Sequence, residues 1–317
     1  MVKIAIAGGS GNVGQEILDA LVATKKHEIL LLSRKDAPVE ATAPGVTWVR
    51  TSYKDPLELA RILRGVHTVL SFILVHSDRG NVAQKHLIDA AVQAGVKRFA
   101  PSEWASSSFK HITWYAGKGE IRRYLQELNR DKKVLEYSLF QPGMFVNYLT
   151  YPHKSSKHVA PIEAPIDFHN RRVLMTEGCA DYAISLTTVQ DLANVVARAV
   201  EYHGEWPVVG GIRGSHVTVG QLIAIGERVR GGRFFVDMVK MADVKAGKLD
   251  ASWKPRAGSP GVPREIFEAL ATRLMTGILL DMSAGLLSVS DEWNRLLPDY
   301  EFTPADVFLT EAWLGKP

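Results

Sequence analysis

The sequence has few of the features that mark secreted or membrane proteins. Its 317 residues include a single cysteine, Cys179, which cannot form a disulfide within the chain. We therefore expect a reducing compartment and a small buried side chain at this position. No apolar run approaches the roughly 20 residues that a membrane-spanning helix needs. The first strand-like segment begins at Lys3, which leaves no room for a signal peptide. These absences favour a cytoplasmic protein without a membrane segment.

Clusters of basic or metal-binding residues are also missing. The net charge is only +4, and Lys and Arg occur in short pairs such as Lys25-Lys26 and Arg122-Arg123. No basic run alternates with aromatic residues, so nucleic acid is not an expected partner. His153, His158 and His169 could meet a substrate or lie in surface loops, but no two histidines are four residues apart. We therefore expect no metal site.

What the chain does have is a strand, a glycine-rich turn, a helix and a second strand within its first 35 residues. The apolar run 3–7 leads into the turn 8–14, and the apolar residues that follow have helical spacing. In a dinucleotide site such glycines permit a tight turn, close approach of the pyrophosphate and close helix packing, while the positive helix end faces the phosphates. The alternatives are a plain strand–helix turn and an S-adenosylmethionine site. The loop residues expected to contact a dinucleotide are Gly8, Ser10, Gly11, Asn12, Val13 and Gly14.

The end of the second strand indicates which dinucleotide binds. NAD sites usually have a carboxylate there for the ribose 2′-OH, whereas this strand ends in Ser33-Arg34-Lys35. A guanidinium can pair with a 2′-phosphate through two hydrogen bonds, so NADP(H) is favoured, with Arg34 and Lys35 as contacts. The other interpretation is an ordinary solvated charge, and Asp36 lies close enough to complicate the assignment. Arg34 also argues against S-adenosylmethionine, for which an acidic ribose ligand is expected.

Strands and helices alternate over some 140 residues, which predicts an α/β fold with a Rossmann-type, doubly wound parallel sheet. We expect a dinucleotide-binding domain over 1–150, with the helix 187–203 packing back on it, and a smaller substrate-binding portion over 151–317. The expected strands lie at 3–7, 28–32, 46–50, 66–74, 96–100 and 136–140. Helices are expected from residue 56 and near 81–94, 119–130, 187–202, 219–230, 263–276 and 304–314. Loops and short strands over a pocket are expected for 144–185, and an exposed loop or lid for 254–263.

The carboxyl ends of the strands are where ligands of such sheets bind, and they supply the remaining candidates. Ser71 and Phe72 follow the fourth strand and should contact the cofactor. Lys118 opens a helix near the same crevice, where burial would make its amine a general acid–base, although a solvated lysine is the simpler interpretation. The Tyr-x-x-x-Lys pair of ordinary short-chain dehydrogenases is absent, and Tyr115 is either a helical-turn neighbour of Lys118 or a loop aromatic. An aromatic-binding wall is expected from Met144, Phe145, Tyr148 and Tyr151.

Several segments resemble the isoflavone reductase-like and NmrA-like group of atypical short-chain dehydrogenase/reductase relatives. Residues 96–104 are similar to its KRF-x-PSE-[FW] element, and Lys118-Gly119-Glu120-Ile121-Arg122-Arg123 to the K-x-x-I-R-R element of its reductase branch. The resemblance continues through 142–147, 187–193 and 297–303. Ala105 stands where the group usually has glycine, and His67 where it commonly has aspartate.

The resemblance implies an NADPH-dependent reductase of a small aromatic or conjugated, secondary-metabolite-like substrate. It assigns catalysis to Lys118, the phosphate turn to Gly8, Gly11 and Gly14, and the 2′-phosphate to Arg34. It also implies a homodimer. The alternative within the same group is a non-catalytic dinucleotide redox sensor that binds a protein partner, and the lysine at position 118 favours the enzyme.

Overall fold

The fold is described from a computed structural model that covers residues 2–38, 43–108, 110–254 and 264–317. Residues 255–263 of the loop expected over 254–263 therefore lie outside the described part. The chain divides into two compact units, which are described separately below. The first consists of Met1–Trp104, Trp114–Gln141 and Leu192–Gly211, and the second of Ala105–Thr113, Pro142–Asp191 and Ile212–Pro317.

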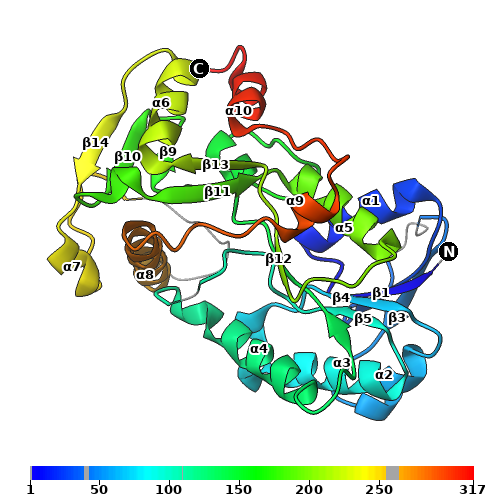
Figure 1. The fold of residues 1–317 in the computed structure, drawn as a ribbon. Helices are drawn as coiled ribbons and strands as arrows, with labels where there is room; N and C mark the ends of the chain where they lie inside the picture. The colour runs from blue at the N-terminus through cyan, green and yellow to red at the C-terminus, as the bar shows by residue number, and fades with distance from the viewer. Residues whose placement is uncertain (1, 39–42, 109, 255–263) are drawn as a thin grey trace. The chain divides into compact units, whose positions relative to one another are not determined.

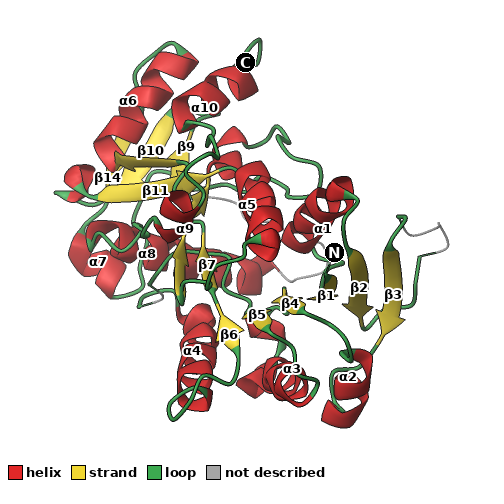
Figure 2. Ribbon diagram, turned by 45° about the vertical axis from the view of Figure 1, so that its right-hand side comes forward, coloured by secondary structure: helices red, strands yellow, loops and turns green. Residues whose placement is uncertain are grey.

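The first unit is built on a six-stranded parallel sheet with helices on both faces. Its strand order is β3-β2-β1-β4-β5-β6, which confirms the predicted doubly wound fold. Helices α1 and α5 cover one face, and α2, α3 and α4 cover the other (Figures 1 and 2). The strands are β1 (Lys3–Ala7), β2 (Glu28–Ser33), β3 (Val46–Arg50), β4 (Thr68–Ser71), β5 (Arg98–Ala100) and β6 (Glu136–Tyr137). The helices are α1 (Asn12–Thr24), α2 (Pro56–Ile62), α3 (Val82–Gln93), α4 (Ala116–Leu128) and α5 (Val189–Glu201), of which the part from Leu192 belongs to this unit.

Local sequence signals explain where these elements begin and end. All four residues of β4 are buried, as expected of a central parallel strand covered on both faces. Helix α2 has Pro56 in its first turn, and the Asp55 side chain accepts a hydrogen bond of 2.9 Å from the Leu57 N–H. Gly95 follows α3 in the left-handed region, with φ +75°, a conformation that glycine adopts without steric cost.

Three predicted strands are shorter than expected or divided. The strand expected over 96–100 begins at Arg98. The strand expected over 66–74 is limited to β4, which runs from Thr68 to Ser71, and the chain then forms a short 3₁₀ segment, Val75–Ser77. The strand expected over 136–140 is split at Ser138. The Ser138 N–H still reaches β5, whereas the next residues form β7 (Leu139–Gln141) and pair with β12 (Val209–Gly211). Helix α4 also begins three residues before the expected residue 119.

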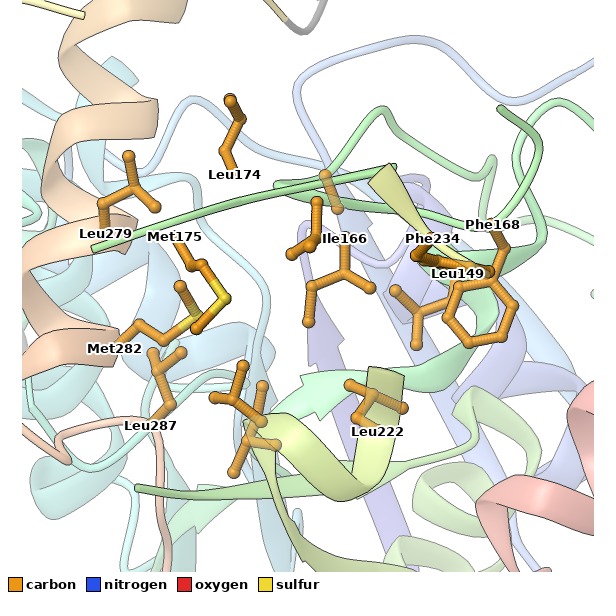
Figure 3. Close-up of a cluster of buried hydrophobic side chains, with 14 of the residues drawn as sticks. Leu149, Ile166, Phe168, Leu174, Met175, Leu222, Phe234, Leu279, Met282 and Leu287 are labelled. Atoms are coloured by element: carbon orange, nitrogen blue, oxygen red, sulfur yellow. The ribbon is translucent and has the colours of Figure 1, made fainter. Parts of the chain in front are cut away.

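The second unit is assembled from short strands around its own core. Strands β8 (Met144–Phe145), β11 (Ala183–Thr187) and β13 (Ser215–Thr218) form one small sheet, and β9 (Ile166–Asp167), β10 (Arg172–Met175) and β14 (Phe235–Met238) form another. The helices are α6 (Val219–Arg230), α7 (Met241–Lys245), α8 (Arg264–Ser283), α9 (Glu292–Leu296) and α10 (Ala305–Trp313). Figure 3 shows the buried side chains between them, among them Phe168, Leu222 and Leu279. Cys179 is fully buried in this core, as expected.

Within the residues that the structure describes, no helix combines the length and the apolar composition needed to cross a bilayer.

Candidate functional site

The turn after β1 leaves no room for side chains. Gly8 has φ +72°, and a Cβ there would lie 3.0 Å from the backbone of Phe72. A Cβ on Gly9 would lie 2.6 Å from the Ile6 side chain, and one on Gly14 would lie 2.8 Å from the Gly9 Cα. Distances under 3 Å are steric clashes, so the glycines allow this turn, β4 and α1 to pack together. Within this turn Gly11 is exposed, whereas Gly8 is half-buried and Gly9 is buried.

The first turn of α1 is suited to an anion. Gly11 is the N-cap and supplies no side-chain hydrogen bond, and the first helical turn contains no acidic residue. Gly11 and Asn12 are exposed, with Ser10 and Val13 half-buried beside them. A helix start with available N–H groups and no competing carboxylate favours a phosphate. The bare turn and this helix start together fit a dinucleotide pyrophosphate.

The charges beyond β2 have a defined arrangement. Arg34 and Lys35 are exposed, while the buried Ser33 hydroxyl accepts a 3.1 Å hydrogen bond from the Lys35 N–H. The Asp36 carboxylate lies 2.7 Å from the Arg50 guanidinium at the end of β3. Arg50 thus offsets the one nearby negative charge that complicated the sequence interpretation, and Arg34 remains suited to a phosphate.

Tyr53 is a residue of this region that sequence reasoning missed. Its side chain is buried, and its hydroxyl accepts a 3.2 Å hydrogen bond from the Gly8 N–H and donates one of 2.8 Å to the Leu32 carbonyl. Burial raises the pKa of this phenol, which keeps it neutral. Tyr53 therefore ties the glycine turn to the end of β2. A tyrosine in a loop after the third strand carries no sequence signal for this role.

Lys118 lies in the first turn of α4 and is only 6% exposed. Its Nζ donates a hydrogen bond to the backbone carbonyl of Glu103 and lies 4.4 Å from the centroid of the Tyr115 ring. Burial, opposed by Glu103 and assisted by Arg122, lowers the pKa of Lys118 to about 8. The structure therefore does not support the interpretation of Lys118 as a solvated lysine, and it places Tyr115 beside the amine. An amine with this pKa can hold or release a proton near neutral pH.

Glu103 and Arg122 join the two segments on which Lys118 depends. The carboxylate of Glu103 is 1% exposed, and Arg122 donates to its two oxygens from Nε at 3.1 Å and from Nη2 at 2.6 Å. This two-point geometry is the strong form of a charge-assisted hydrogen bond. It fixes the loop after β5 against α4, one turn beyond Lys118.

Aromatic rings pack together where the loop after β5 meets the end of β4. The Trp104 ring is stacked on Phe72 at 4.5 Å and on Phe140 at 5.5 Å, and its Nε1 donates to the Ser71 carbonyl at 2.7 Å. Ser71 and Phe72 are themselves buried. The contact of Ser71 and Phe72 with a cofactor stays a prediction, and in the structure both residues pack at this edge of the sheet.

The residues predicted to form a substrate wall all lie in the second unit. Phe145 is buried and packs edge-on against Tyr148 at 5.6 Å, while Met144 packs on the core of this unit. Tyr148 and Tyr151 line a narrow depression without room for a water molecule, together with Ile162, Glu163 and Phe168 among others. The structure therefore groups two of the four predicted residues around one depression.

Comparison with known proteins assigns the chain to a family. A family model described as NmrA-like matches residues 2–247. The chain belongs to the NmrA-like family. This confirms the resemblance inferred from the motifs.

Individual relatives of this NmrA-like chain carry oxidoreductase names. "Oxidoreductase BOA1" of Botryotinia fuckeliana is 37% identical over 51% of this chain, and the match spans only 55% of that protein. "Oxidoreductase swnN" of Metarhizium robertsii is 26% identical over 100% of this chain and 98% of its own length. Among solved structures, Escherichia coli quinone oxidoreductase QOR2 complexed with NADPH superposes with a TM-score of 0.69 at 23% identity, covering 98% of this chain and 99% of that one.

The segments that carried the NmrA-like resemblance are bonded to one another. Glu103 of the first segment pairs with Arg122 of the second. In the second unit, the Asn147 side chain accepts a 2.9 Å hydrogen bond from the Val189 N–H at the start of α5. Asp191, two residues further on, accepts a 2.8 Å hydrogen bond from the Tyr300 hydroxyl. These polar residues are therefore explained by contacts between segments that are distant in sequence.

Proposed function

We propose that the chain is an NADPH-dependent oxidoreductase that reduces a small aromatic or conjugated molecule, with Lys118 as its catalytic residue. This proposal rests mainly on the buried amine of Lys118. The amine lies on the side of the sheet where the strands end, as does the glycine turn after β1. The oxidoreductase names of the relatives and the NADPH in the E. coli structure support it.

The proposed dinucleotide site uses the edge of the sheet between β1 and β4, where the strand order reverses. The N–H groups of the first turn of α1, beside the exposed Gly11 and Asn12, would hold the pyrophosphate, and Arg34 with Lys35 would hold the 2′-phosphate. Tyr53 would keep the turn in place through its bond to Gly8. The residues assigned to this site are Gly8, Ser10, Gly11, Asn12, Val13, Gly14, Arg34, Lys35, Ser71, Phe72 and Lys118, with the buried Ser71 and Phe72 contributing backbone and packing.

The chemistry assigned to the chain's own residues is proton transfer. NADPH, when bound, supplies a hydride to an electrophilic carbon of the substrate. Lys118 in its ammonium form would stabilise the negative charge that develops on a conjugated substrate oxygen and then donate a proton to it. The Glu103 carbonyl holds one Lys118 N–H, which orients the amine. The orienting contact reduces the entropy lost on reaching the reactive arrangement.

The substrate class is proposed from side-chain chemistry. Met144, Phe145, Tyr148 and Tyr151 provide an apolar and aromatic surface suited to a ring. The pocket beside Tyr148 and Tyr151 is too narrow to accommodate a ring as it stands, so a substrate would have to widen it. The name of the E. coli protein makes a quinone a suitable first probe.

The test is a calorimetric titration with NADPH, NADP⁺, NADH and NAD⁺, followed by NADPH oxidation with 1,4-benzoquinone as electron acceptor. We expect tight NADPH binding, a large preference over NADH, and quinone-dependent oxidation that Lys118→Ala abolishes. Indifference to the 2′-phosphate would refute the assignment of Arg34. Tight binding of the oxidised cofactors without turnover of any conjugated probe would instead favour the redox-sensor function.

A further inference from the structure

The proposed catalytic Lys118 and a second cation, Arg122, both bind Glu103. Lys118 and Arg122 are four residues apart on α4, which places them on the same face of that helix. Glu103 meets both, but with different atoms. Its carboxylate binds Arg122 at two points, whereas its backbone carbonyl accepts the Lys118 hydrogen bond. The side chain and the backbone of Glu103 are thus linked to different cations.

The contacts of Glu103 with both cations help to fix the position of the Lys118 amine. The carbonyl of Glu103 belongs to a loop, and loops hold their backbone less firmly than strands or helices do. The bidentate bond to Arg122 anchors that loop residue to a helix, and the Glu103 N–H is further bonded to the Pro101 carbonyl at 2.7 Å. The atom that orients the Lys118 amine is therefore held by the Glu103–Arg122 pair.

Glu103 and Arg122 also place two opposite charges close to the Lys118 amine. The Glu103 carboxylate favours the proton on the Lys118 ammonium and the Arg122 guanidinium disfavours it, while the Tyr115 ring faces the amine. Because the two charges form a pair, their effects on the proton of Lys118 oppose each other. Removal of either one leaves the other unbalanced in a buried setting, where charge effects are large.

We propose that Glu103 and Arg122 are positioning residues that act through Lys118, fixing the direction of its amine and balancing its proton affinity. This proposal extends the proposed function. It depends on that function only for the step in which Lys118 donates its proton to the substrate. It assigns a role to two residues that the dinucleotide site and the substrate wall do not use.

The test is an NMR titration of the Lys118 amine in protein with ¹³C-labelled lysine side chains, without cofactor or substrate. The Lys118 signal is identified by its loss in Lys118→Ala. We expect Glu103→Gln to move its titration midpoint to lower pH by about one unit and Arg122→Gln to move it to higher pH by a similar amount. The double variant E103Q/R122Q should return the midpoint close to that of the wild type.

Conservative and matched variants separate positioning from folding. Arg122→Lys keeps the charge but loses the two-point bond, so the midpoint should stay while the Lys118 signal broadens. Arg123→Gln removes the same charge from the exposed neighbouring position and should leave the signal unchanged. If Glu103→Gln does not fold, the Arg122 variants still decide. A midpoint unchanged in every folded Glu103 and Arg122 variant would overturn the proposal.

Turnover measurements test the roles of Glu103 and Arg122 independently of the NMR titration. With 1,4-benzoquinone and NADPH, the pH at which kcat declines should shift with the NMR midpoint in each variant, with KM changed less than kcat. Retained turnover in Lys118→Ala would refute the catalytic role while leaving the measured coupling of Glu103 and Arg122 to the amine intact. The two proposals therefore fail by different measurements.

Discussion

The two units of this chain use opposite ways of building a sheet. In the six-stranded sheet of the first unit, β1 to β6 are all parallel, although the same unit also pairs β7 with β12 across some 70 residues. In the second, β14 pairs with β10 across some 60 residues of chain, and parallel and antiparallel pairs occur within one sheet. The first arrangement is encoded in local periodicity, whereas the second depends on contacts between remote segments. The proposed cofactor site belongs to the first kind of structure and the proposed substrate wall to the second.

The strongest test of this comparison is Lys118→Ala in the first unit. Loss of a positioned general acid costs about 10² to 10⁴ in kcat, and NADPH affinity should change little because the proposed phosphate contacts are made by other residues. Turnover of 1,4-benzoquinone and calorimetry measure the two quantities. Lys54→Ala, at an exposed position, is the control. Full activity in Lys118→Ala would exclude the catalytic assignment.

Leu222→Ala perturbs the second unit alone. Leu222 is fully buried in the core shown in Figure 3, and such a truncation costs about 2 to 5 kcal/mol in the free energy of unfolding. Denaturant unfolding followed by circular dichroism measures the loss. At temperatures where the variant remains folded, its NADPH affinity should equal that of the wild type. A parallel loss of NADPH affinity would show that the units do not divide the function as proposed.

Arg34→Ala addresses the choice of dinucleotide. Removing a charge-assisted pair with the 2′-phosphate should weaken NADPH binding by about tenfold to a hundredfold and leave NADH binding nearly unchanged. Calorimetry with both cofactors checks this, and Arg61→Ala on the exposed side of α2 is the control. Equal losses for the two cofactors would remove the 2′-phosphate assignment.

The same contrast explains which features the sequence could predict. The glycine turn, Arg34 and Lys118 could be predicted from the residues next to them in the sequence. Each of them follows an apolar strand or begins a helix whose apolar residues have helical spacing. Tyr53 was missed because its bond to Gly8 spans 45 residues and follows no spacing rule. Strands β13 and β14 lack the apolar alternation of a half-buried strand, and most of the β14 side chains are exposed. Their formation depends on pairing with β11 and β10, which no local pattern describes.

The pH dependence of turnover tests the electrostatics of the first unit. Burial lowers the pKa of Lys118 to about 8, and the proposed chemistry needs the protonated amine. Activity should therefore be full below this pKa and fall about tenfold per pH unit as the pH rises well above it. Initial rates with 1,4-benzoquinone between pH 6 and 10 measure the profile. A rate that increases through pH 8 would mean that the neutral amine is the active form.

The smallest expected effect concerns the substrate wall in the second unit. Tyr148→Ala removes an aromatic surface that packs against Phe145 and lines the narrow pocket. The KM for 1,4-benzoquinone should rise about threefold to tenfold, as expected for the loss of one aromatic contact. NADPH affinity should not change, since the residues proposed to bind the phosphates all lie in the first unit. Tyr182→Ala, a more exposed tyrosine of the same unit, is the matched control. A change in NADPH affinity without a change in KM would place Tyr148 with the cofactor, and the proposed separation of binding roles between the two units would then be wrong.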